Sequence, residues 1–285
     1  MKEAVLYQKL EDKKVRCSLC AHRCKINPGK EGICRVRENR DGILFTTAYG
    51  KTIAQHIDPI EKKPLYHFYP GSGAYSIATP GCNFHCLFCQ NWDISQITDR
   101  DLLQSGHEAS PEQIVSNAKQ AGCKSIAYTY TEPTIFFEYS YDIALPAHEA
   151  GIMNIYVSNG YMTAGMLDMI GPYLDGINVD LKAFREETYK RLIGARLQPV
   201  LDSLKKIKEL GIWLEVTSLI IPGINDDPGE VKDMADFMVK ELGPDVPWHI
   251  SRFFPSYKMR ETPATPVRTL QMARETGVNA GLNYI

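Results

Sequence analysis

The sequence of 285 residues lacks the segments that would direct a chain into or across a membrane. No run of residues approaches the ~20 consecutive apolar residues that a membrane-spanning helix needs. The first residues, MKEAVLYQKLEDKK, are charged throughout and contain no apolar core of the kind found in secretory signal peptides. We therefore expect no membrane partner and a cytoplasmic location, where thiols stay reduced.

An excess of basic charge is also missing, because 32 Lys and Arg residues stand against 34 Asp and Glu residues. Proteins that bind nucleic acids through phosphates usually carry a basic surplus. The formal net charge of −2 argues against a nucleic-acid partner, although it leaves room for a tRNA held by a local patch. Low-complexity segments and strict repeats are absent, and a hydrophobic share of 44% suits an ordinary globular core.

What the sequence does contain is an alternation of short apolar runs with amphipathic segments. The runs, rich in β-branched and aromatic residues, predict buried strands at 74–79, 125–130, 152–158, 175–181, 212–221 and 248–254. A capping box, Ser110-Pro111-Glu112-Gln113, opens the first of the helices, which we expect at 110–121, 163–170, 186–193, 199–210 and 229–242. This order predicts an α/β fold: a partial or full parallel β/α (TIM-like) barrel with its active site at the carboxyl ends of the strands.

Residues 1–73 do not follow this alternation, and we predict that they form a small cysteine-rich N-terminal appendage on a barrel of residues 74–285. The last residues, Gly281–Ile285, resemble the start of a further strand, which would mean that the native chain runs further.

Eight cysteines fall into two groups, with one left over. In a reducing compartment, clustered cysteines indicate metal or catalytic sites rather than disulfides. Cys123 follows a glycine and precedes a predicted strand, so we expect it to be a small buried apolar residue.

The second group, Cys82, Cys86 and Cys89, has the spacing C-x3-C-x2-C on one loop after the first predicted strand. Three thiolates can bind three irons of a 4Fe–4S cluster and leave the fourth iron open. An open iron can chelate the amino and carboxylate groups of S-adenosylmethionine (SAM), which one electron then cleaves to a deoxyadenosyl radical. Phe88 precedes the third cysteine, where its ring can pack against adenine. The alternative is a zinc site with His85 as the fourth ligand.

From Ser76 to Phe254 the sequence resembles the radical SAM superfamily, and within it the pyruvate formate-lyase activating enzymes. The resemblance implies that Glu132, in Tyr-Thr-Glu-Pro, contacts the SAM amino group; the alternative is that Glu132 caps a helix beginning at Pro133. Ser158 and Asn159 stand where the activating enzymes have an Asp-Thr-Asn-Gly turn. Val157 replaces the aspartate of that turn, so a carboxylate contact to ribose is missing there.

Two further segments carry the resemblance. Asp180-Leu181-Lys182 matches the family's Asp-Leu-Lys and implies that Lys182 reaches SAM, with Asp180 orienting Lys182 or bonding the ribose. Pro247-Trp248-His249 resembles Pro-Tyr-His and implies a SAM contact from His249. The alternatives are a solvated surface lysine for Lys182 and a core histidine for His249.

A closer resemblance, over nearly the whole chain, is to the radical SAM member of the AmmeMemoRadiSam group. It is carried by the cysteine segment Cys17–Cys34, HIDPIEKKPLYHFYPGS, TPGCNFHCLFCQNWDISQ, YTEPTIFFEY and the Ser-Asn-Gly-Tyr turn. It implies hydrogen abstraction from an unassigned substrate and a one-electron donor of flavodoxin or ferredoxin type. A glycyl-radical activating enzyme, with a protein as substrate, is one alternative. A metal-binding scaffold or electron-transfer protein that does not cleave SAM is another.

The first group, Cys17-x2-Cys20-x3-Cys24-x9-Cys34, has the four thiols of a closed metal site. Basic neighbours such as Arg16 and Arg23 favour thiolates. Zinc and a second iron–sulfur cluster both accept four thiolates, so the metal stays open, and disulfides or free thiols are further alternatives. For the histidines and aspartate of the loop His56–Ser72 we expect packing or lid roles.

Overall fold

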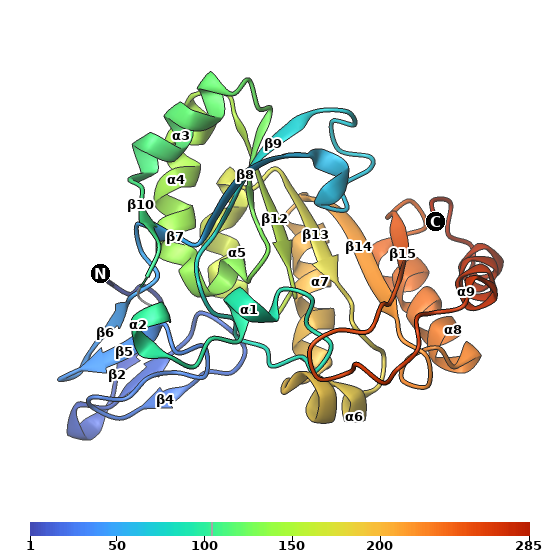
Figure 1. Cartoon of the computed structure of the whole chain (residues 1–285), viewed down its shortest axis with the longest axis horizontal. Coiled ribbons are helices and arrows are strands. Elements are labelled where there is room, and N and C mark those ends of the chain that lie inside the picture. The colour runs from blue at the N-terminus through green and yellow to red at the C-terminus, as the bar shows by residue number, and fades with distance from the viewer. Residues whose placement is uncertain (104) are drawn as a thin grey trace.

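The computed structural model describes residues 1–103 and 105–285 and is built on a seven-stranded sheet with the order β15-β14-β13-β12-β11-β9-β8. Six strands are parallel: β9 (Gly73–Ala78), β11 (Ser125–Tyr128), β12 (Met153–Ser158), β13 (Gly176–Asp180), β14 (Trp213–Ile220) and β15 (Trp248–Arg252). β8 (Ala54–Pro59) pairs with β9 in the antiparallel direction. The six predicted strands are confirmed, and they form a partial barrel rather than a closed one because the order ends at β15 and β8 (Figure 1).

Helices pack along one side of this sheet (Figure 1). The longer ones are α3 (Pro111–Gln120), α4 (Phe137–Glu149), α5 (Ala164–Ile170), α7 (Gln198–Glu209), α8 (Pro228–Phe237) and α9 (Val267–Ala280), and the short ones are α1 (Trp92–Ser95), α2 (Arg100–Leu103) and α6 (Glu186–Thr188). Side-chain caps start several of them, as where Ser110 accepts a hydrogen bond from the Gln113 N–H at 3.2 Å. The structure contains no described helix long and apolar enough to cross a membrane.

Two of the longer helices, α4 and α9, were not predicted, and neither were the short helices α1 and α2. α4 buries aromatic and charged residues together and contains Pro146, so its sequence shows no clean apolar stripe. α9 contains Gly277, which weakens a helix, but a Cβ there would lie 3.1 Å from the Trp248 ring. The strand expected at Gly281–Ile285 is wrong: the segment is irregular, and Tyr284 accepts one hydrogen bond, from the Trp248 N–H at 2.9 Å.

The N-terminal residues form small antiparallel sheets beside the barrel (Figure 1). One contains β1 (Lys2–Glu3), β6 (Ile43–Thr46) and β5 (Arg37–Arg40); the second contains β2 (Tyr7–Lys9), β3 (Val15–Cys17) and β4 (Lys25–Ile26); β7 (Lys51–Thr52) pairs with β10 (His107–Glu108). Val15, Val36 and Leu44 are fully buried in the same hydrophobic core as the barrel strands. Because β8 belongs to the main sheet, residues 54–59 are part of the barrel sheet rather than of the appendage.

The loop after β8 crosses the sheet near the amino end of β14, where it is held by the fully buried Glu215. The Glu215 carboxylate accepts hydrogen bonds from the backbone N–H groups of Tyr66 and His67, both at 2.9 Å, and from the Trp213 indole at 3.0 Å. His249 Nε2 lies 2.6 Å from the same carboxylate. Burial alone would raise the pKa of Glu215, but these hydrogen bonds lower it below its ordinary value.

The expected packing role of this loop is seen directly at Asp58. Its carboxylate binds Lys62 at 2.8 Å and the fully buried Lys63 at 2.7 Å, and it also accepts a hydrogen bond from the Tyr130 hydroxyl. Asp58 lies in β8, and these contacts join it to Lys62 and Lys63 of the following loop and to Tyr130 just after β11. The loop is therefore a wall of the barrel interior.

We predict that Glu215→Gln lowers the free energy of unfolding by about 2 to 3 kcal/mol at neutral pH, because an amide replaces an acceptor of four hydrogen bonds. Since the folded-state pKa of Glu215 is depressed, its contribution is present above the ordinary Glu pKa of ~4.3 and is lost as the pH falls through the folded value. Urea unfolding followed by circular dichroism at several pH values measures both effects. The exposed Glu149→Gln is the control, and equal midpoints for the two variants at pH 7 would contradict the prediction.

Candidate functional site

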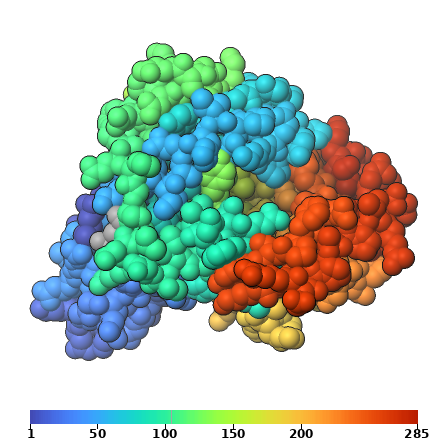
Figure 2. Space-filling model, viewed as in Figure 1, coloured from blue at the N-terminus to red at the C-terminus, as the bar shows by residue number. Residues whose placement is uncertain are grey.

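A cavity of about 530 Å³ lies along the inner face of the sheet and reaches the carboxyl ends of the strands. Its wall contains every residue predicted from the sequence for the cluster and SAM except His249: Cys82, Cys86, Phe88, Cys89, Glu132, Ser158, Asn159, Asp180 and Lys182. Figure 2 shows a hollow between the blue residues around β8 and the teal segment that follows β9, with green and yellow strand residues at its floor. Residues that are distant in the sequence therefore share one space.

The cysteine loop that follows β9 is fixed by backbone hydrogen bonds to the turn Tyr189–Ile193 after α6. The His85 N–H donates to the Ile193 carbonyl and the Leu87 N–H donates to the Leu192 carbonyl, both at 2.9 Å. The loop begins at Gly81, which has a φ of +98°. Glycine adopts this conformation at little cost because it has no Cβ. Its irregular backbone is thus paired rather than free to move.

The segment after β15 holds the other side of this loop. The Lys258 N–H donates to the Leu87 carbonyl at 3.0 Å, and the Ser256 hydroxyl donates to the Cys89 carbonyl at 3.2 Å. The ring of Tyr257 stacks on Trp92 of α1, with centroids 5.4 Å apart and planes at 11°. The cysteine loop is therefore clamped between two segments that come much later in the chain.

Burial keeps two of the three thiols protonated as long as no metal is bound. Burial raises the pKa of Cys82 well above its ordinary value and raises that of Cys86 to about 12, while the nearby Lys182 ammonium acts in the opposite direction on Cys86. A buried thiolate of this kind becomes favourable when iron replaces the proton.

The arrangement fits a cluster better than a single ion. A single zinc usually takes four protein ligands in a structural site, whereas three cysteines bind three irons of a 4Fe–4S cluster and leave the fourth iron open. His85, the fourth ligand of the zinc alternative, instead has Nδ1 3.1 Å from the Gln96 side-chain oxygen. Three cysteines on the wall of one cavity are thus suited to hold a 4Fe–4S cluster with one iron facing the cavity.

Glu132 follows β11 and is buried, with 1% of its surface exposed. Its carboxylate accepts hydrogen bonds from the Thr134 N–H and hydroxyl, the Ser158 hydroxyl and the Asn159 N–H, at 2.6 to 3.0 Å. The capping alternative is therefore correct, because Glu132 caps the turn that begins at Pro133. Capping does not remove Glu132 from the cavity wall, where it is a buried carboxylate beside Cys82.

Lys182 follows β13 and is not a solvated surface lysine, because only 17% of its side chain is exposed. Its ammonium lies 2.9 Å from the Asp180 carboxylate. Burial would lower the pKa of Lys182, but Asp180 and the Cys86 thiol raise it overall, so the group is charged. Asp180 therefore orients Lys182, which is one of the two roles expected for it.

The Ser-Asn-Gly-Tyr turn after β12 connects Glu132 to the cysteine loop. The Asn159 amide donates to the Asn83 side-chain oxygen at 2.8 Å and points toward Cys82 Sγ at 3.9 Å. Gly160 has φ +70°, and a Cβ at this position would lie 2.8 Å from Val179. Only glycine fits this turn without displacing β13.

His249 has contacts that the sequence did not indicate. It pairs with Thr217 across β14 and β15, and Thr217 lines the cavity. His249 itself bonds Glu215, and its ring packs at a tilt against Tyr66 with the centroids 4.9 Å apart. A contact between His249 and SAM stays a prediction.

Several cavity residues were missed by the sequence analysis, namely Ser95, Gln96, Tyr130, Thr217, Leu219 and Ser251. The last three occupy alternate positions on β14 and β15, so the period of two in a strand could have identified them as inward-facing. Tyr130 has φ +63°, which is uncommon for a residue other than glycine and which sequence does not reveal.

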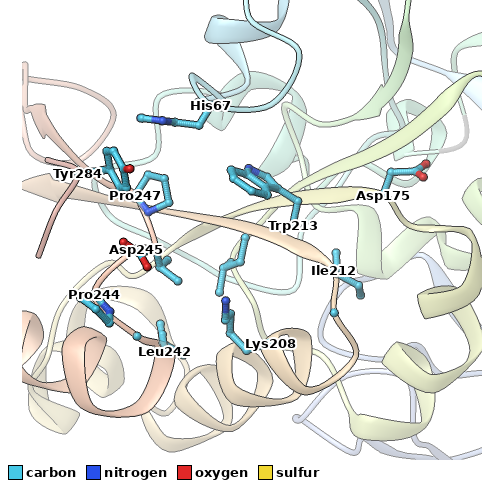
Figure 3. A pocket seen from close by; sticks show the side chains of 14 residues that line it. His67, Asp175, Lys208, Ile212, Trp213, Leu242, Pro244, Asp245, Pro247 and Tyr284 are labelled. Carbon is cyan, nitrogen blue, oxygen red and sulfur yellow. The ribbon is translucent and has the colours of Figure 1, made fainter.

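A larger cavity, about 740 Å³, lies near the amino ends of β14 and β15 (Figure 3). His67, Trp213 and Tyr284 stand around it, with Lys208 and Asp245 from the helical side. None of the cysteines reaches it, and parallel barrels carry their chemistry at the opposite ends of the strands. We therefore assign the site to the smaller cavity.

The N-terminal cysteines Cys17, Cys20, Cys24 and Cys34 share a separate recess of about 20 Å³, and Cys123 is buried away from both groups. All eight cysteines are free, so the disulfide alternative is not observed. A metal at the four N-terminal thiols stays a proposal, because their side chains do not converge on one point.

Comparison with known proteins agrees with the geometry. The family model described as the radical SAM superfamily matches residues 76–238. An uncharacterized protein of Methanocaldococcus jannaschii is 45% identical over all of this chain and 84% of its own length. A pyruvate formate-lyase 1-activating enzyme of Escherichia coli is 22% identical over 57% of this chain and 67% of its own.

Among solved structures, a radical SAM methyltransferase from Sphaerobacter thermophilus matches 76% of this chain and 67% of its own, with a TM-score of 0.58 and 14% identity. At that identity the likeness speaks for the fold alone. The family match covers more than half of the chain, on the strands and the loop that build the cavity. This chain belongs to the radical SAM superfamily, whose members use a 4Fe–4S cluster and SAM.

Proposed function

We propose that this chain is a radical SAM enzyme of the AmmeMemoRadiSam type, which abstracts a hydrogen atom from a substrate not yet assigned. The observation that carries the proposal is the placement of Cys82, Cys86 and Cys89 on the wall of one cavity with a buried carboxylate, Glu132, and a partly buried ammonium, Lys182. Its volume of about 530 Å³ lies in the range of sites for ligands of SAM's size.

A 4Fe–4S cluster held by Cys82, Cys86 and Cys89 would supply the one-electron reduction of SAM that starts hydrogen abstraction from the substrate. The protein positions the three cysteine thiolates and leaves the adjoining cavity free for SAM.

Opposite charges within the cavity suit the two ends of the amino-acid part of SAM. Glu132 offers a buried carboxylate to the N–H groups of the amino end, and Lys182 offers a charged ammonium to the carboxylate end. Both side chains are held by their own hydrogen bonds, Glu132 by Ser158 and Thr134 and Lys182 by Asp180. Little reorganisation is needed when the ligand binds, which favours affinity.

Phe88 and His249 complete the proposed SAM site. Phe88 is 4% exposed and lines the cavity beside the third cysteine, where an aromatic face suits a purine ring. His249 lies on β15 beside Thr217 of β14, and Glu215 binds its ring. A contact between His249 and SAM would therefore come from the β14–β15 end of the sheet.

A glycyl-radical activating enzyme is the second candidate, supported by the 22% identity with the E. coli activating enzyme. Its substrate would be a glycine Cα of a partner protein, and its electron donor a flavodoxin or ferredoxin. A scaffold or electron-transfer role without SAM cleavage is the candidate of a different class. Charged groups placed to bind SAM favour an enzyme over that role.

We expect the anaerobic protein, given dithionite and SAM, to release deoxyadenosine, and the triple variant Cys82→Ala, Cys86→Ala, Cys89→Ala to lose about four irons and this activity. Cys123→Ser, a buried cysteine outside both groups, should keep both. Iron analysis and chromatography of deoxyadenosine are the measurements. Full iron content and continued SAM cleavage in the triple variant would refute the proposal.

Glu132→Gln should weaken SAM binding by about 10- to 100-fold, because it removes a buried charge partner worth ~1.5–3 kcal/mol. Lys182→Met should do the same from the other end of the ligand. Equilibrium dialysis of the anaerobic cluster-containing protein measures the affinity, with Glu149→Gln as the control. Unchanged affinity in both cavity variants would place SAM elsewhere.

A further inference from the structure

The four N-terminal cysteines surround one recess although they belong to different turns. Its volume is about 20 Å³, and its remaining wall is mainly apolar, with Leu19, Ile26 and Ile135. Cys17 is buried, and the other three are partly covered. These four thiols do not line the cavity that contains Cys82, Cys86 and Cys89, so the chemistry of that cavity does not explain them.

Tight backbone turns bring these cysteines together. The Cys17 N–H donates to the Cys24 carbonyl at 3.0 Å, and the Arg23 N–H closes a turn on the Cys20 carbonyl at 3.1 Å. Arg23 has φ +47°, and Arg35, next to Cys34, has φ +63°. Positive φ at two arginines is a conformational cost that the surrounding structure has to offset.

Arg37 provides an independent observation. It lines the recess and is 2% exposed, and its Nη2 binds the Glu138 carboxylate. Its Nε and Nη1 groups have no hydrogen-bond partner. Buried charged donors without acceptors are costly, so their presence beside four sulfurs points to acceptors at the recess.

The size of the recess decides which metal centre it suits. About 20 Å³ accommodates one water-sized sphere, so it suits one ion and is too small for an eight-atom cubane. Four thiolates around one divalent ion make a closed tetrahedral site with a net charge of −2, which Arg37 would partly neutralise.

We propose that Cys17, Cys20, Cys24 and Cys34 bind one Zn²⁺ ion, with the free N–H groups of Arg37 donating to its thiolates. The sulfurs surround the recess without meeting at one point, so metal binding would require them to move inward. This site is separate from the radical cluster and does not depend on the proposed function.

The site has a structural consequence for the radical cluster loop. His22 lies between two of the ligands, and its Nε2 is 2.8 Å from the Asn83 carbonyl, next to Cys82. The Ala21 N–H donates to the Tyr161 carbonyl at 3.1 Å, in the turn that follows β12. A zinc ion at the recess would therefore hold the N-terminal segment against the mouth of the cavity.

The test is the metal content of the full chain purified anaerobically. The wild type should contain about one zinc and about four irons. Cys24→Ser with Cys34→Ser should lose the zinc and keep the iron, whereas the alanine variant of Cys82, Cys86 and Cys89 should lose the iron and keep the zinc. Cys123→Ser is the control and should keep both. Loss of iron but not zinc from the Cys24/Cys34 variant would mean a second cluster and overturn the proposal.

A second measurement uses the wild-type fold and so does not depend on how variants fold. After zinc is removed with a chelator, Co²⁺ should restore one equivalent of metal with the visible bands of a tetrahedral thiolate site; a lack of such bands would overturn the proposal. Arg37→Gln combined with Glu138→Gln removes both buried charges, and competition with a chromophoric chelator should then show about 10- to 100-fold weaker zinc binding. Unchanged affinity would exclude the role of Arg37. Deoxyadenosine release, measured in parallel, reports separately on the radical SAM function.

Discussion

The loop that carries Cys82, Cys86 and Cys89 has no regular structure, so its position depends on hydrogen bonds to segments far away in the sequence. Its carbonyls and N–H groups pair with the turn Tyr189–Ile193, with Lys258 after β15, and with His22 from the N-terminal sheets. Because an unpaired buried backbone group costs free energy, these hydrogen bonds favour one conformation of the loop. The relative positions of the three thiols therefore depend on contacts with distant segments of the chain.

The two ends of the sheet perform different tasks. Near the amino end of β14, the Glu215 carboxylate has four partners and holds the loop that closes the interior. At the carboxyl ends of the strands, Glu132 and Lys182 are also fixed by hydrogen bonds to neighbouring side chains, but both line a cavity. This separation is typical of β/α barrels, where one end supports stability and the other chemistry. Only the second end combines buried charge, thiols and space.

Much of this arrangement could be predicted because it rests on local patterns. The β-branched runs identified the six parallel strands, and the C-x3-C-x2-C spacing identified the loop that meets Glu132 and Lys182. Contacts between distant segments could not be predicted. Three features depend on tertiary packing: the hydrogen bond between His249 and Glu215, the positive φ of Tyr130, and the open side of the barrel. α9 was missed because the packing of Gly277 against Trp248 outweighs the poor helix propensity of glycine.

The central claim is that three thiolates hold a cluster whose fourth iron faces the cavity between Glu132 and Lys182. Electron paramagnetic resonance of the anaerobic, dithionite-reduced protein, recorded with and without SAM, tests it most directly. The account predicts the signal of a reduced 4Fe–4S cluster whose spectrum changes when SAM is added, as expected for a ligand that binds the open iron. A cluster signal that stays the same at saturating SAM, or the lack of any cluster signal, would contradict it.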